Sequence, residues 1–295
     1  GESMGRFRIS AHGRLQDWIA DEKGYFADEG LDYEINVRYL ETADQDIDEP
    51  DKGDVRVGAY ELYQMGGGGK KDMSCACHWA VNEAATGGAG RMWGHAYSVL
   101  PSAVYVRGDS KIQSAEDLAD LDVAVGYHSG SHFSTLQALE ALIEPDRIRL
   151  KFMGFPYDRV EALLAGEVPA AAAWNAATYL LEQQGCRKIL DTTFMAGFMF
   201  PPETDPGDVE KYFAGLRRAQ MDLDLEPERY KAHYLKEIPA RFRDLVDVRR
   251  FGPGERVAFL PYTEEMYLRA QRWMQERGLF GERPAIPSYA SAVQA

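Results

Sequence analysis

The first 190 residues of the chain alternate between two periodicities of apolar positions. Residues 7–11 and 31–40 alternate apolar and polar side chains, as half-buried strands do. Between them, residues 15–26 space their apolar side chains three and four positions apart, which predicts a helix. Further strands are predicted at 72–77, 102–106, 123–126, 148–153, 170–173 and 189–191, and further helices at 60–65, 78–85, 114–118, 133–142, 157–165 and 175–184. From Pro206 onward the pattern is almost wholly helical.

This order of elements predicts an α/β fold. Strands that alternate with helices are typical of mostly parallel sheets, and helices alone at the end of the chain indicate a segment that returns to an earlier lobe. Four glycines at 66–69 look like a phosphate-binding loop, but the Gly-Lys-Ser/Thr ending and the preceding strand are missing. We interpret them as a connector, and the acidic residues 41–54 as a solvated loop.

The amino-acid composition and net charge exclude several classes of function. The chain has 295 residues, of which 45% are hydrophobic, as in ordinary globular proteins of one or two domains. Its formal net charge of −14 repels phosphate backbones, so no nucleic acid partner is expected. No apolar run approaches the length of a membrane-spanning helix. Three cysteines, Cys75, Cys77 and Cys186, are too few for a disulfide framework.

Histidine, cysteine and tryptophan side chains are concentrated at the junctions between predicted strands and the helices that follow them. In α/β sheets, ligands bind beyond the carboxyl ends of the strands, where the free N–H groups of helix starts favour anions. Four such junctions hold most of the histidines, two cysteines and two tryptophans. We therefore predict a cleft for a small organic, anionic ligand that is lined by His12, Cys77, His78, Trp79, His128, Ser129, Gly130, Ser131, His132, Trp174 and Asn175.

The junction at residues 75–78 (Cys-Ala-Cys-His) allows three interpretations. The two cysteines share one strand face and could act as small buried hydrophobes. If the protein is an enzyme, Cys75, Cys77 and His78 are the catalytic candidates, because a neighbouring histidine can activate a thiol. The same three residues are weak candidates for a metal site, since the spacing lacks the paired pattern of a zinc ribbon. No cofactor is expected, and neither a Gly-X-Ser-X-Gly nor a Gly-X-Gly-X-X-Gly motif offers an independent catalytic signature.

An ordered set of short motifs resembles a known family. They are EKGYF with EGLD at 22–32, DS, I and EDL at 109–118, VAVG before HSGS at 123–131, and LLAG before an alanine-rich strand at 163–173. Over residues 6–200 these resemble the solute-binding proteins of ABC importers, in the branch for sulfonates, nitrate and taurine that includes the thiamine-pyrimidine synthases. Pro169 replaces the family's usual acidic residue before the alanine-rich strand, and the Cys/His-rich junction at 75–78 is unusual for a transport receptor.

The resemblance implies a periplasmic-binding-protein fold of type II. Two α/β lobes with central mixed sheets would be joined by two crossovers, with a helical C-terminal segment. Lobe 1 would comprise residues 1–99 and 198–295, and lobe 2 residues 100–197. A small anionic or zwitterionic organic ligand would bind in the interlobe cleft, which closes by hinge motion, and an ABC transporter permease would be the partner.

Two alternatives stay open beside transport. One is a cytosolic enzyme on the same fold, of a lyase, desulfinase-like or cofactor-biosynthesis type. The other is a metal-binding receptor. The first residues contain no apolar signal-peptide core. A periplasmic location is expected if a signal peptide was removed, and a cytoplasmic one if Met4 is the native start.

Overall fold

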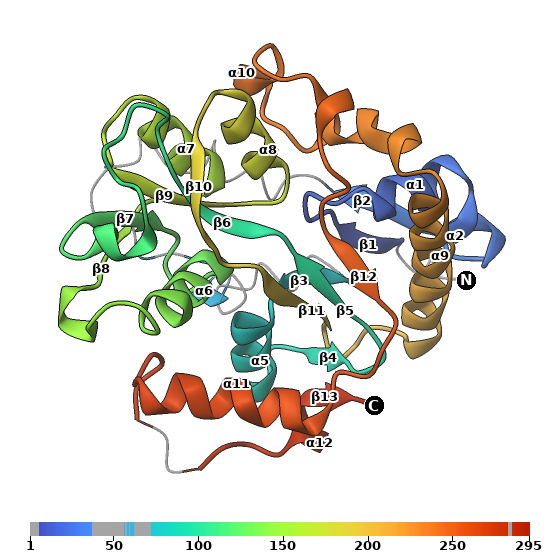
Figure 1. The fold of residues 1–295 in the computed structure, drawn as a ribbon. Coiled ribbons are helices and arrows are strands. Elements are labelled where there is room, and N and C mark those ends of the chain that lie inside the picture. Colours follow the sequence, from blue (N-terminus) through green and yellow to red (C-terminus); the bar gives the residue numbers. More distant parts are fainter. Residues whose placement is uncertain (1–5, 37–55, 57, 59, 62–71, 283–284) are drawn as a thin grey trace.

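The computed structural model describes residues 6–36, 56, 58, 60–61, 72–282 and 285–295, and it has the predicted α/β architecture (Figure 1). The expected loop at 41–54, the glycines at 66–69 and most of the expected helix at 60–65 lie outside the described residues. Among the helices that the structure describes, none is long and apolar enough to cross a membrane.

One sheet has five strands and mixed direction. Its strand order is β10-β6-β9-β7-β8. The strands are β6 (Ser102–Val106), β7 (Asp122–Val125), β8 (Arg149–Phe152), β9 (Ala170–Trp174) and β10 (Arg187–Asp191). β7 runs parallel to both β8 and β9, whereas β6 runs antiparallel to β9 and to β10. Valine and alanine side chains fill both faces, because helices cover both sides of this sheet.

The second sheet has six strands and is mostly antiparallel. It contains β3 (Ser74–Cys77), β4 (Arg91–Trp93), β5 (Tyr97–Leu100), β11 (Phe194–Phe200), β12 (Arg256–Ala258) and β13 (Val293–Gln294). β11 pairs antiparallel with β3, β4 and β5. The expectation of mostly parallel sheets was therefore wrong here, while the mixed sheets implied by the resemblance are confirmed. The pattern predicts no strand at β5 or β11, and these apolar runs are the antiparallel partners of this sheet.

A parallel pair of strands extends this second sheet. β1 (Phe7–Ser10) pairs with β2 (Tyr33–Asn36), and an isolated bridge joins Ile9 to Met73. The chain passes from the six-stranded to the five-stranded sheet at Pro101, between β5 and β6. It returns at residues 192–193, between β10 and β11. These are the two crossovers of the implied fold; the lobe boundaries at 99/100 and 197/198 stay a prediction.

The helices follow the predicted order with two differences. They are α1 (Gln16–Glu22), α2 (Tyr25–Asp28), α5 (His78–Thr86), α6 (Gly130–Leu139), α7 (Pro156–Leu164), α8 (Ala176–Gln183), α9 (Pro206–Leu225), α10 (Ala240–Arg243), α11 (Glu264–Glu276) and α12 (Tyr289–Ala292). The predicted helix at 15–26 is divided into α1 and α2. Ser114 and Asp117 form the predicted capping box, but on a single 3-10 turn.

The C-terminal segment returns to the first elements of the chain. As expected, α9 packs across α1 and α2, on the right of Figure 1, whereas α11 lies against α5. Other 3-10 turns follow α9 at Pro227–Lys236 and Val248–Arg250, and another stands at Pro145–Arg147. The expectation of an almost wholly helical end was wrong in part, because β12 and β13 each complete an edge of the six-stranded sheet.

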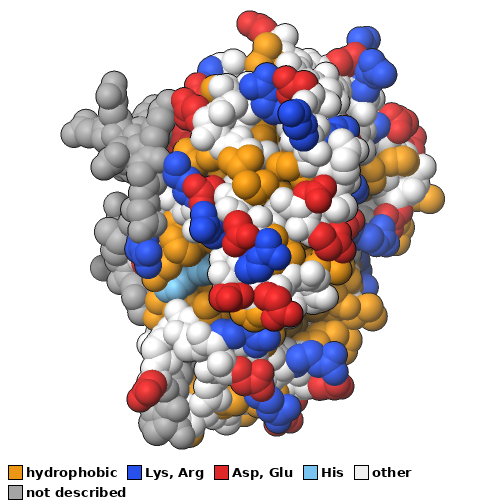
Figure 2. All heavy atoms as spheres, turned by 60° about the vertical axis from the view of Figure 1, so that its left-hand side comes forward, with side chains coloured by type: hydrophobic (Ala, Val, Ile, Leu, Met, Phe, Trp, Pro, Cys, Tyr) orange, Lys and Arg blue, Asp and Glu red, His pale blue; other side chains and the backbone are white. Residues whose placement is uncertain are grey.

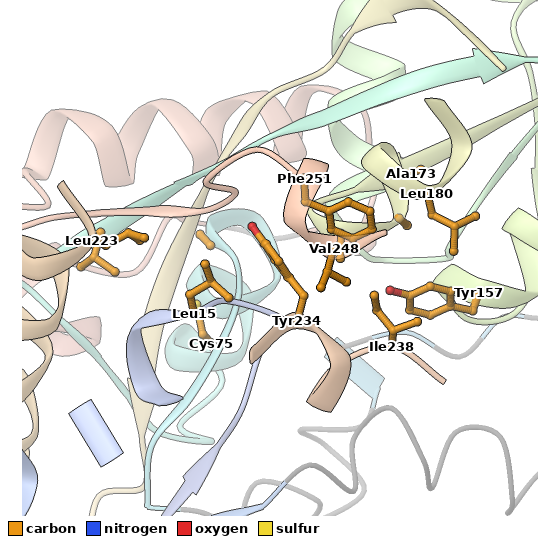
Figure 3. Close-up of a cluster of buried hydrophobic side chains, with 14 of the residues drawn as sticks. Leu15, Cys75, Tyr157, Ala173, Leu180, Leu223, Tyr234, Ile238, Val248 and Phe251 are labelled. Atoms are coloured by element: carbon orange, nitrogen blue, oxygen red, sulfur yellow. The ribbon is translucent and has the colours of Figure 1, made fainter. Parts of the chain in front are cut away.

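The largest apolar core joins the two sheets through this returning segment. Tyr234, Val248 and Phe251 pack between Leu15, from the start of the chain, and Leu180 on α8 (Figure 3). This buried core fixes the relative positions of the elements that carry the cavity-lining residues. On the face shown in Figure 2, acidic and basic side chains are interspersed, so no single-sign patch for a polyanion is visible there.

Candidate functional site

A cavity lies where strand ends of the two sheets meet. Six of the residues predicted to bind ligand line it: His12, Cys77, Ser129, Gly130, Ser131 and Trp174. Eight further lining residues were not predicted: Gly58, Ala76, Gly126, Gly154, Phe155, Pro156, Arg159 and Phe194. The cavity volume of about 60 Å³ is smaller than the ~150 Å³ that holds a benzene molecule. A ligand of more than a few atoms therefore requires the walls to move apart.

One end of the cavity presents hydroxyl groups and a guanidinium. The Ser129 hydroxyl donates to the carbonyl of Gly126 at 2.6 Å and lies 2.8 Å from the Ser131 hydroxyl. Ser131 Oγ accepts the main-chain N–H of Gly126 at 2.8 Å. A carbon placed on Gly126 would lie 2.9 Å from Arg159 Nη1, so the guanidinium reaches the same point. Ser129 precedes α6 without capping it through its side chain, and the first turn of α6 lines the cavity.

Arg159 is held in place from the first turn of α7. It is buried, and it donates from Nη1 to the carbonyl of Gly154 at 3.1 Å and from Nε to that of Ala172 at 3.4 Å. Pro156 starts α7 directly after β8 and so fixes where the helix begins. These two bonds orient the guanidinium at the edge of the cavity.

The charged lining of the cavity is basic. Among the described residues, no carboxylate lines it, whereas Arg159 and His12 do. Burial opposes a charged His12, but the neighbouring Cys75 and Glu255 outweigh burial and raise its pKa to about 10. The surroundings of His12 therefore favour its protonated, positively charged form. A basic cavity in a chain of net charge −14 favours an anion.

The other walls are aromatic. Trp174 stacks on His12 with ring centroids 5.0 Å apart and an interplanar angle of 19°. Phe155 and Phe194 line the cavity as well. Such rings can cover the apolar part of a ligand whose charged group lies at the Arg159 end.

A buried ionic cluster supports the His12 side. His12 Nδ1 lies 3.4 Å from Glu255 Oε1, and Arg14 Nη1 donates to Glu255 Oε2 at 2.9 Å. Arg14 also donates from Nε to Asp17 at 2.6 Å and from Nη2 to Tyr212 at 3.0 Å. Burial would raise the pKa of Glu255, yet Arg14 and His12 hold it below its usual value. This cluster pairs its charges within the protein.

The predicted pair of Cys77 and His78 is not set up as a nucleophile and base. Cys77 Sγ accepts the N–H of Ala80 at 3.4 Å, and burial raises the pKa of its thiol to about 12. His78 Nδ1 lies 3.1 Å from the Tyr262 hydroxyl, and burial lowers its pKa to about 4. A thiol with this pKa is almost wholly protonated at neutral pH, and the thiolate is the reactive form. Trp79 packs in an aromatic cluster with Phe194.

His128 and His132 also lie outside the cavity lining. The main-chain N–H of His128 donates to His132 Nδ1 at 3.1 Å, and the His128 ring contacts Glu61 and the carbonyl of Leu279. Burial, with His128 and Arg56 nearby, lowers the pKa of His132 to about 3. Both histidines thus support the loop before α6.

Asn175 joins the two sides of the cavity instead of lining it. Its side chain donates to the carbonyl of Gly13 and accepts the N–H of Glu255 at 2.9 Å. Gly254 has a φ of +71°, and a Cβ there would lie 2.4 Å from Asn175 Oδ1, so the close approach requires glycine. The ligand roles predicted for Asn175, His78, Trp79, His128 and His132 stay predictions, as do those of the six lining residues.

Sequence reasoning missed Arg159 and Glu255 for different reasons. Residues 153–156 form a fifth junction between a predicted strand and a predicted helix, so the rule applied to the other four would have found the Arg159 end. Glu255 has no such local signal. Its partners His12 and Arg14 are more than two hundred residues away along the chain, and only the fold brings them together.

Comparison with solved structures shows the fold. The alkanesulfonate-binding protein SsuA from Xanthomonas axonopodis pv. citri, bound to MOPS, is 15% identical with a TM-score of 0.69, over 100% of this chain and 99% of that one. The ligand-binding component of an ABC-type import system from Staphylococcus aureus, with zinc bound, is 11% identical with a TM-score of 0.68, over 99% and 97%. The chain thus has the type II fold of these proteins, as the resemblance implied.

An enzyme has the same fold. A variant of the desulfurization enzyme DSZB, in complex with biphenyl-2-sulfinic acid, is 13% identical with a TM-score of 0.60, over 98% of this chain and 96% of that one. No family model and no curated protein matches the sequence. At these identities the similarity establishes the fold and leaves the ligand to the residues of the cavity.

Proposed function

We propose that the protein binds a small organic anion, with a sulfonate or carboxylate group at the Arg159 end of the cavity. One observation carries the proposal: the guanidinium of Arg159 and the hydroxyls of Ser129 and Ser131 converge on Gly126, in a cavity with no carboxylate among its described lining residues. Hydrogen bonds between charged groups are stronger than neutral ones, so this end favours an anion over a neutral ligand.

The aromatic walls support an organic ligand over an inorganic ion. Trp174 offers apolar surface beside His12, and Phe155 and Phe194 add further aromatic surface to the cavity lining. The SsuA protein bound to MOPS, a sulfonate, is consistent with this assignment. The role implied is that of a solute-binding protein that presents its ligand to an ABC permease, with closure between the proposed lobes. The thiamine-pyrimidine part of the resemblance stays a prediction.

Calorimetric titration with paired ligands tests this function. Short alkanesulfonates and carboxylates of increasing chain length would each be compared with a neutral sulfone or amide of the same size. We expect the anion of each pair to bind at least tenfold more tightly, because the neutral partner forfeits the charged hydrogen bonds. Equal affinity within the pairs, or no binding by any anion, would refute the proposal.

An enzyme is the second candidate, on the strength of one contact. His12 hydrogen-bonds Cys75 and lies beside Glu255, which is the order of nucleophile, base and orienting carboxylate in thiol enzymes. Cys75 is buried and does not line the cavity, which favours binding over chemistry. Rapid alkylation of Cys75 at neutral pH, blocked by a bound anion, would favour the enzyme.

A further inference from the structure

Three side chains with metal-ligating atoms meet behind the cavity wall. His12 follows β1, Cys75 lies in β3 and Glu255 precedes β12; their ligand atoms all lie within 4.8 Å of one another. Cys75 and Glu255 are buried, while the His12 side chain is 12% exposed and lines the cavity. An imidazole nitrogen, a thiolate sulfur and a carboxylate oxygen are the ligands that zinc takes in proteins.

The spacing of His12 and Glu255 is compatible with a shared metal ion as well as with a long hydrogen bond. The 3.4 Å between His12 Nδ1 and Glu255 Oε1 exceeds the ~2.7–2.9 Å of a charge-assisted hydrogen bond. Zinc–nitrogen and zinc–oxygen bonds of about 2.1 Å at a tetrahedral angle place two ligand atoms about 3.4 Å apart. The longest separation in the group, up to 4.8 Å, must shorten by about 1 Å, which small side-chain rotations can supply.

Glu255 is already oriented for this role by the groups around it. Its second carboxylate oxygen, Oε2, accepts from Arg14 at 2.9 Å. Its main-chain N–H donates to Asn175 at 2.9 Å, and its main-chain carbonyl accepts from Gln16 at 2.6 Å. These bonds leave the other carboxylate oxygen of Glu255, Oε1, facing His12 Nδ1. Hydrogen bonds from outside the ligand set orient ligands in this way in known metal sites.

A divalent ion would replace the positive charge of His12 in the buried cluster. Arg14 and a protonated His12 contribute two positive charges, and Asp17 and Glu255 contribute two negative ones. A divalent ion bound by a neutral His12 and a Cys75 thiolate adds one net positive charge in place of the His12 proton, so the cluster stays neutral. The guanidinium of Arg14 is therefore compatible with a cation beside it, because Asp17 and Glu255 both accept its hydrogen bonds.

We infer that His12, Cys75 and Glu255 bind a divalent transition-metal ion of the zinc class, with the fourth coordination position open to the cavity. Three protein ligands and one open position are typical of zinc sites that meet a substrate or ligand. His12, on the cavity wall, marks the route by which the ion enters. This set shares only Cys75 with the sequence prediction, and it stands whether or not an organic anion binds.

Titration of chelator-treated protein with Zn²⁺ alone, and separately with Co²⁺, tests the site. We expect one ion per chain, and a sulfur-to-cobalt charge-transfer band in the near ultraviolet. Cys75→Ser should weaken zinc binding at least tenfold and remove that band. Cys77→Ser is the matched control, because its sulfur lies on the same strand but outside the ligand set, and it should leave affinity and band unchanged.

A second variant keeps the test decisive if one protein folds poorly. His12→Gln should weaken zinc binding to a similar degree, and the melting temperature of each metal-free variant reports whether it is folded. Three results would overturn the inference. They are no stoichiometric binding by the folded wild type, zinc bound equally well by a folded Cys75→Ser or His12→Gln protein, and an equal loss in Cys77→Ser.

Discussion

The two sides of the cavity each hold a buried arginine, and the two arginines have different hydrogen-bond partners. On the His12 side, Arg14 is paired with Asp17 and Glu255 inside the protein. On the other side, Arg159 donates to two main-chain carbonyls, and its Nη1 reaches the cavity beside Gly126. A buried ion pair within the protein supports the structure, whereas a guanidinium that lines a cavity can also contact a ligand. We therefore expect the first side to govern stability, and the second side to recognise the proposed anion.

Removing the paired arginine should produce the largest effect. Arg14→Met leaves two buried carboxylates without their cation, and we expect the free energy of unfolding to fall by about 3–5 kcal/mol. Urea denaturation followed by circular dichroism measures it. Arg256→Met is the control, because its ion pair with Asp224 is exposed and should be worth less than about 1 kcal/mol. Similar losses in the two variants would contradict the role of Arg14 as the buried cation that Asp17 and Glu255 require.

The arginine that faces the cavity should matter for binding. Arg159→Gln retains a hydrogen-bonding side chain but removes the charge, and we expect the dissociation constant for an organic anion to rise about 10- to 150-fold. Calorimetric titration of the folded variant measures this, with Arg147→Gln as the control, because Arg147 is exposed in the 3-10 turn before β8. An unchanged affinity in Arg159→Gln would remove Arg159 from the site.

The free energy of unfolding should also depend on pH through Glu237 on the His12 side, and a single substitution should remove the contribution of Glu237. Burial raises the pKa of Glu237 to about 7, with Trp18 donating to Oε1 at 2.6 Å. Because the folded-state pKa lies above the unfolded value, the stability from this proton is full below about pH 4.5 and is lost as the pH rises through 7.

Glu237→Gln keeps the Trp18 bond and cannot ionise. We expect its free energy of unfolding to fall less than that of the wild type between pH 5 and 8, by about 2–3 kcal/mol. Denaturation at a series of pH values measures the difference. His12, whose pKa is also raised, should impose a further loss of stability up to about pH 10 in both proteins. Parallel curves over pH 5–8 would show that Glu237 ionises as it does in the unfolded chain.

The smallest effect concerns the shape of the Arg159 side. A Cβ added at Gly130 would lie 2.2 Å from Phe194 Cζ, so Gly130→Ala must displace that ring. We expect the dissociation constant of an anionic ligand to rise about tenfold, which corresponds to about 1.4 kcal/mol. The double variant Gly130→Ala with Phe194→Leu should recover most of the affinity. Failure of the second change to recover it would place the effect in the backbone of α6.

More of the fold than of the candidate site could be predicted from the sequence. Motifs spread over residues 6–200 implied the type II fold, since each follows a local periodicity or turn. The strand-end rule found Ser129, Ser131 and Trp174 on the cavity for the same reason. It could not find Glu255, whose neighbours are distant in the chain. Nor could it predict that burial would set the pKa values of Cys77 and His78 in opposite directions to those of a reactive pair.

The anion site at Arg159 is tested most directly by a crystal structure of the protein with 2-bromoethanesulfonate, with the bromine located by anomalous scattering. We expect the sulfonate oxygens to lie within hydrogen-bond distance of Arg159 and of Ser129 or Ser131, with the bromine toward Trp174. A sulfonate bound instead against His12 and Glu255, or outside this cavity, would show that Arg159 does not hold the anion.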